Sequence, residues 1–191
     1  TENDVINFNA DSSKETKREI QTKPADISVE THYIQSIGNS KDLCTPGYST
    51  GCSQGDGFID FAVAEIENYN SGCEDLNGTG WSQYLGLGPA ILTPGYSYDF
   101  IMKTGYGDQY VTIWIDFNND EELTEDEKIL SNYIMQSAGT LYTVSAEIPS
   151  DALMGQHLMR ARTNWAGSCN DPCSDYTYGE AEDYYVVIGE A

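Results

Sequence analysis

The sequence predicts an all-β fold, an antiparallel β-sandwich of the jelly-roll type with negligible helix. Two observations lead to this fold class. Apolar residues recur at every second position in several short segments, and clusters rich in Gly, Pro, Asn and Asp separate those segments. No window keeps a helical period for three turns, and many short strands between tight turns are typical of sandwiches and jelly rolls. The expected strands are 57–66, 96–103, 110–116, 128–134, 140–148, 156–163 and 181–188.

Two parts of unequal size are expected along the chain. Residues 1–39 are predicted to be a polar N-terminal linker or arm, because residues 1–26 mix charges without an apolar period. Within this arm, 27–36 alternates in the manner of an edge strand. Residues 40–191 are predicted to form the sandwich domain.

Charge and cysteine content restrict the partners and the compartment. The chain has 31 acidic and 9 basic residues and a net charge of −22, which argues against nucleic acid or an anionic membrane as partner. No apolar run approaches the roughly 20 residues of a membrane span. Five cysteines lie among turn residues without zinc-site spacing, so we expect disulfides and a secreted or cell-surface protein. The pairing stays open, and the odd count leaves one cysteine over.

An acidic loop follows the strand expected at 110–116. Its sequence, WIDFNNDEELTEDEKIL, places oxygen-bearing side chains at the ligand positions of an EF-hand-type calcium loop. Glu121 departs from that pattern, because it stands where glycine normally makes the sharp turn. The alternative is a solvated acidic hairpin that binds no metal ion. We expect one structural calcium ion. Its ligands would be a backbone carbonyl near Glu122 and the side chains of Asp116, Asn118, Asp120, Glu122 and Glu127.

The last strand carries a second acidic motif, YGEAEDYYVVI. Arg160 and Arg162 share one face of the preceding strand, and Glu182 and Asp183 occupy the next. Paired strands would allow Arg–carboxylate bridges across the ladder, with a structural role.

Aromatic residues in turn-rich stretches predict a glycan site. Aromatic faces stack on sugars, and nearby polar side chains complete the hydrogen bonds. Trp114, by contrast, belongs on a strand. Guanidinium groups beside these aromatics would suit an acidic or sulfated sugar on a loop stiffened by a Cys169–Cys173 bridge, whereas Arg–carboxylate pairing would make a neutral glycan the better ligand. The candidate ligand-binding residues are Trp165, Arg162, Arg160, Tyr176, Trp81 and Tyr84.

Several motifs together resemble the GEVED domain. They are an opening CTPGYSTGCSQGDGFIDFAVAEIENYNSGC, then VTIWIDFNND, IPSDALMGQHLMRAR, NDPC and the final YGEAEDYYVVI, with Ala181 in place of the valine of the name. The resemblance extends over about residues 40–188. It implies an accessory β-sandwich of large secreted or surface proteins, mostly from Bacteroidetes, attached to proteases, adhesins or polysaccharide-degrading enzymes. The resemblance also implies that Asp116, Asn118, Asp120 and Glu127 form a cation loop.

Two classes of function follow. The first is a non-catalytic, calcium-stabilised carbohydrate-binding module of a secreted polysaccharide-degrading enzyme or adhesin. The second is a spacer or protein-interaction domain of a large surface protein or protease, without a glycan ligand. Catalysis is not expected, because the only histidines, His32 and His157, lie in different strand candidates and no nucleophile, metalloprotease or nucleotide signature is present.

Overall fold

The computed structural model describes residues 43–73 and 80–190, all of which belong to the compact unit Gly38–Ala191. The predicted arm at 1–39 and its edge strand at 27–36 lie outside the described residues, so both stay predictions. The described part is built almost entirely of strands.

The strands confirm the all-β prediction. Each of the expected segments contains a strand, and the described residues include no α-helix, only one 3-10 turn, η1 (Glu125–Glu127). Short strands that the periodicity did not indicate add to them. The strands are β1 (Tyr48–Gly51), β2 (Phe58–Val63), β3 (Ile66–Tyr69), β4 (Trp81–Gln83), β5 (Ala90–Leu92), β6 (Ser97–Thr104), β7 (Gln109–Ile115), β8 (Lys128–Met135), β9 (Tyr142–Glu147), β10 (Gly155–Trp165), β11 (Tyr176–Tyr178) and β12 (Ala181–Ile188).

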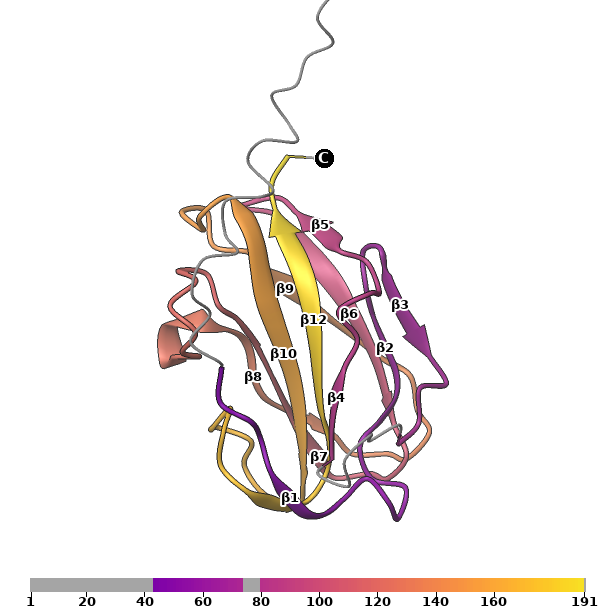
Figure 1. The fold of residues 1–191 in the computed structure, drawn as a ribbon. Coiled ribbons are helices and arrows are strands. Elements are labelled where there is room, and N and C mark those ends of the chain that lie inside the picture. Colours follow the sequence, from indigo (N-terminus) through magenta and orange to yellow (C-terminus); the bar gives the residue numbers. More distant parts are fainter. Residues whose placement is uncertain (1–42, 74–79, 191) are drawn as a thin grey trace, which may run out of the picture. The chain divides into compact units, whose positions relative to one another are not determined.

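Three sheets make up the domain. A six-stranded sheet has the order β4-β12-β10-β7-β8, with β5 also pairing with β12, and a four-stranded sheet has the order β3-β2-β6-β9. Figure 1 shows the larger sheet in front of the smaller one, with β1 crossing the lower end of the front sheet. β1 pairs with β11 in parallel. Pairing is not antiparallel throughout, because β4 and β5 also run parallel to β12.

The register of β10 decides what faces the core. Met159 pairs with Tyr184 and Ala161 with Glu182, so these residues face inward, while the intervening Arg160 faces outward opposite Asp183. A large apolar cluster fills the space between the two sheets. A smaller cluster lies on the outer face of the front sheet, and it is formed by Trp114, Leu123 and Cys169.

Two disulfides join segments that lie far apart in the sequence. Cys44 is bonded to Cys173 and Cys52 to Cys73, whereas Cys169 is free and buried. The presence of disulfides is therefore confirmed, and of the pairings left open by the sequence, Cys169–Cys173 does not form. Cys169 packs instead beside Trp114 in the small outer cluster.

Among the residues that the structure describes, no helix is long and apolar enough to cross a membrane.

Candidate ligand groove and cation loop

Arg160 is buried beneath the outer layer and forms an ion pair with the terminal acidic motif. Its Nε and Nη2 donate to the two carboxylate oxygens of Asp183 at 2.7 and 2.8 Å. Its Nη1 donates to the carbonyls of Cys44 at 2.8 Å and Pro172 at 3.1 Å. The predicted cross-strand bridge is confirmed for this pair. Arg160 therefore links the sheet to both chain segments that the Cys44–Cys173 disulfide joins.

Arg162 is equally buried but has no carboxylate partner in the described residues. It donates to the hydroxyl of Tyr48 at 3.0 Å and to the carbonyls of Asp171 and Ser174, each at 2.7 Å. Its guanidinium also lies 4.8 Å from the ring centre of Tyr48 and 4.2 Å from that of Tyr176. Cation–π contact and hydrogen bonds to main-chain carbonyls therefore hold this charge in place.

The two arginines cannot contact a ligand in this arrangement. Both are 0% exposed, and their donors are directed to protein acceptors. The prediction that Arg160 and Arg162 bind a sugar therefore needs correction. The residues anchor the loop that the sugar was expected to touch, because β10 turns them toward the covering segments and not toward solvent.

Glu182 lies on the opposite face from Arg160. Its two carboxylate oxygens accept from the hydroxyls of Ser71 at 3.3 Å and Tyr184 at 2.6 Å inside the sandwich. Burial raises the pKa of Glu182 to about 7, although these two hydrogen bonds oppose the shift. The expected bridge from an arginine to Glu182 is wrong, because the residue next to Asp183 on a strand must face the other way.

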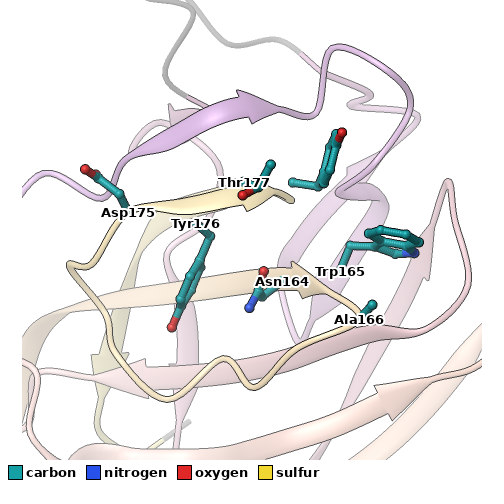
Figure 2. Close-up of a pocket in the computed structure, with 7 residues that line it drawn as sticks. Asn164, Trp165, Ala166, Asp175, Tyr176 and Thr177 are labelled. Carbon is teal, nitrogen blue, oxygen red and sulfur yellow. The ribbon is translucent and has the colours of Figure 1, made fainter.

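An open groove lies where β10 ends beside β11. It has a volume of about 450 Å³, and Figure 2 shows Trp165 at one end and Asp175 at the other, with Asn164 between them. Trp165 is 45% exposed. Its ring meets that of Tyr178 at 88°, with 5.7 Å between the ring centres. The two rings form a corner that can accept a flat apolar ligand face on the indole.

The other predicted aromatic residues have mainly structural contacts. Tyr176 lines the groove, but its ring covers Arg162 and its hydroxyl donates to the carbonyl of Asp171 at 3.2 Å. Trp81 donates its indole N–H to Asp183 at 2.9 Å. Tyr84 stacks on Tyr184 with 5.6 Å between ring centres. Only Trp165 and Tyr176 of the predicted set line the groove, whose remaining lining residues are Asn164, Ala166, Asp175, Thr177 and Tyr178.

The acidic loop after β7 is folded around the carboxylate of Asp116. This side chain is buried and accepts from the backbone N–H of Asp120 at 3.2 Å and of Glu121 at 3.1 Å. Asn118 accepts from the N–H of Asp120 at 2.8 Å. Glu121 has a φ of +66°, so the sharp turn normally made by glycine forms here with a glutamate.

Glu127 closes the loop from its far end. Its Oε2 accepts from the N–H of Thr124 at 2.9 Å, while its buried Oε1 has no hydrogen-bond partner among the described residues. Burial, together with the nearby charges of Glu127 and Asp120, raises the pKa of Asp116 against the backbone hydrogen bonds that lower it. The two carboxylates at the loop ends therefore repel each other.

The remaining predicted ligands lie in the same turn as Asp116, toward solvent. Asn118, Asp120 and Glu122 are exposed, and the amide N–H of Asn118 donates to Asp120 at 2.9 Å. Within residues 43–73 and 80–190, no group of three or more His, Cys, Asp or Glu side chains is arranged to hold a metal ion. The calcium site therefore stays a prediction.

One family model matches part of the chain. The family model described as the GEVED domain matches residues 110–187, which include β7 through most of β12. The match confirms the resemblance, over a shorter span than the 40–188 that the motifs indicated. A comparison with curated proteins found no match.

One solved structure shows a weak similarity. It is the AA10 lytic polysaccharide monooxygenase from Streptomyces lividans, 16% identical, with 78% of this chain and 79% of that chain covered and a TM-score of 0.31. A TM-score this low supports no conclusion about fold or function.

Proposed function

We propose that this chain, of which residues 110–187 match the GEVED domain, is a non-catalytic, calcium-stabilised module that binds a glycan. The glycan lies in the groove at Trp165, and the module serves catalytic or adhesive domains of the same secreted or surface protein. The two disulfides support this compartment, because disulfides persist in oxidising surroundings.

The exposed indole of Trp165 is the observation that carries the proposal. Trp114 is fully buried and Trp81 bonds to Asp183, but Trp165 presents much of its ring beside an open groove. Apolar sugar faces stack on such rings, and Asn164, Thr177 and Asp175 supply hydroxyl partners along the same groove. The preference for acidic or sulfated sugars loses its basis, since both arginines are buried.

Hydrogen bonds hold the turn that precedes the groove residues Asp175 and Tyr176. Asp171 accepts at 2.8 Å from the N–H groups of Cys173 and Ser174, and its pKa is lowered because these hydrogen bonds outweigh its partial burial. Arg162 holds the carbonyls on the other side of the same turn. A preorganised loop loses little entropy when a ligand binds.

In this proposal, a calcium ion bound in the acidic loop stabilises the module. The loop joins β7 to β8, and its buried Glu127 Oε1 without a partner fits an oxygen ligand of a hard cation. Asp116 and Glu127 would hold the ion, with Asp120, Asn118 and Glu122 as further ligands. The ion would neutralise repulsion between the buried carboxylates and fix the hairpin. Its role is structural.

A non-catalytic role agrees with how the described polar residues are used. His157 is buried, and its two ring nitrogens lie 2.7 and 2.8 Å from the carbonyls of Asp116 and Leu153. Cys169 is buried with a pKa raised by burial to about 12, which disfavours the nucleophilic thiolate. Neither group faces the groove.

A panel of soluble oligosaccharides tests the proposal. Wild type should bind at least one of them, and Trp165→Ala should weaken that binding tenfold or more, since stacking contributes about 1–3 kcal/mol. Tyr96→Ala is the matched control, because Tyr96 is 65% exposed but does not line the groove. Equal affinity for wild type and Trp165→Ala would place the ligand elsewhere.

The spacer function is the second candidate, and one observation favours it. In the acidic motif, Asp183 pairs with Arg160 and Glu182 is buried, so both carboxylates have structural contacts. A domain that binds no oligosaccharide in the panel, yet stays folded, would support the spacer.

A further inference from the structure

Resting on the proposed glycan-binding function, we propose that the ligand of the groove is a glycan bearing protonated amino groups. The groove combines the exposed indole of Trp165 with the exposed carboxylate of Asp175, and the described surface offers no free basic group to an anion. The inference names the ligand's charge, which the proposed function leaves open.

The basic side chains of the described residues are all committed to protein partners. Arg160 and Arg162 are buried as described above. Lys103 forms an ion pair with Asp60. Lys128 forms an ion pair with Glu125 and lies 5.8 Å from the ring centre of Trp114. An acidic sugar would therefore find no counter-charge on this part of the protein, and it would be repelled by the net charge of −22.

A carboxylate lies at one end of the groove. Asp175 lines it, is exposed, and forms no hydrogen bond or ion pair with the described residues. Its carboxylate lies so close to Gly47 that a side chain at Gly47 would collide with it. A cation at this end of the groove would gain from the charge of Asp175.

The rings of Trp165 and Tyr178 also favour a positively charged ligand. Ring faces carry a negative quadrupole, so the indole of Trp165 and the phenol of Tyr178 attract an ammonium group as well as the apolar face of a sugar. A neutral sugar would gain the stacking alone. An amino sugar would gain stacking, cation–π attraction and an ion pair with Asp175, and long-range attraction would speed its approach.

Three hexasaccharides of equal length provide the test, used with the full chain at a pH that protonates the sugar amine. They are a glucosamine hexamer, an N-acetylglucosamine hexamer and a galacturonate hexamer. The glucosamine hexamer should bind about tenfold or more tightly than the N-acetylated one. Its affinity should fall as salt rises, because screening shortens the range of attraction to about 8–10 Å. The galacturonate hexamer should not bind.

Two variants distinguish attraction of the amino sugar by Asp175 from attraction by the net negative charge of the protein. Asp175→Asn should weaken glucosamine binding about two- to fivefold while leaving N-acetylglucosamine binding unchanged. Asp151→Asn, an exposed aspartate outside the groove lining, should change neither. Each variant's melting temperature confirms that it is folded.

The outcomes distinguish this inference from the function on which it rests. Equal affinity for the amine and the N-acetyl hexamer would overturn the inference and leave glycan binding intact. Binding of no hexamer or panel glycan would overturn both. A lysine-rich peptide that binds while every glycan fails would assign the amine recognition to a protein partner, and it would also overturn the proposal.

Discussion

Replacing Arg160 with methionine should destabilise the domain, because it removes the contacts that hold the covering loops to the front sheet. Arg160 is buried, and its guanidinium donates to Asp183, Cys44 and Pro172. Methionine keeps most of the aliphatic volume but supplies no donor. Asp183 would keep only the indole N–H of Trp81 among the side-chain donors described here.

The magnitude follows from the burial of both partners. Asp183 is 1% exposed, so its charge would remain in the interior without a counter-charge. Removing one member of a buried ion pair destabilises by about 3–5 kcal/mol. A domain with a total stability of about 5–15 kcal/mol would lose a large part of it. Lys103→Met is the matched control, because the Lys103–Asp60 pair is partly exposed and should contribute about 1 kcal/mol or less.

Urea unfolding followed by tryptophan fluorescence measures both variants. The double variant Arg160→Met/Asp183→Leu should recover most of the loss, because it removes the unpaired charge with its partner. If the single variant fails to fold, recovery in the double variant decides the question. A loss below about 1 kcal/mol for Arg160→Met would refute the view that this ion pair secures the outer layer.

Three further predictions concern the acidic interior, the calcium loop and the free thiol. The pKa of Glu182 is raised to about 7 from an ordinary 4.5 by burial, so the native state holds a proton that the unfolded chain releases between these values. The free energy of unfolding should fall as pH rises through that window, on the order of 3 kcal/mol, and Glu182→Gln should reduce the slope; an unchanged slope would contradict the assignment. Calcium should raise the melting temperature of wild type above that in EDTA, whereas Glu127→Gln should lose the difference and the exposed neighbour variant Asp126→Asn should keep it. Identical melting curves of wild type with calcium and with EDTA would count against the ion. Cys169 should resist alkylation until the protein unfolds, because burial raises its pKa to about 12; rapid labelling under native conditions would show that the small outer cluster is open.

The long strands were predictable because their side chains alternate over six or more residues. The period placed β7, β10 and β12 correctly, and it put Trp114 on a strand. β4, β5 and β11 have three residues each, which is too few for a period to register. Their parallel pairing depends on where the chain returns in space, and local sequence carries no signal for that.

The candidate site was predictable only in part. The alternation of side chains along a strand shows which residues share a face of the sheet, but it does not show which loops cover that face. The Arg160–Asp183 pair followed from placing two strands side by side. That Arg162 would meet carbonyls and tyrosine rings depended on the covering loop, whose path the Cys44–Cys173 bond fixes. Trp165 was found as an aromatic in a turn-rich stretch. Asp175 and Tyr178 were missed, because a single exposed residue has no sequence signature.

The indole N–H resonances of the protein during a glycan titration test the central claim most directly. Trp114 is buried and Trp81 donates to Asp183, so these two provide internal controls for a change in fold. With the tightest-binding glycan of the panel, the Trp165 resonance should shift progressively and saturate while the other two stay in place. A Trp165 resonance that does not move at saturation would contradict glycan binding at this groove.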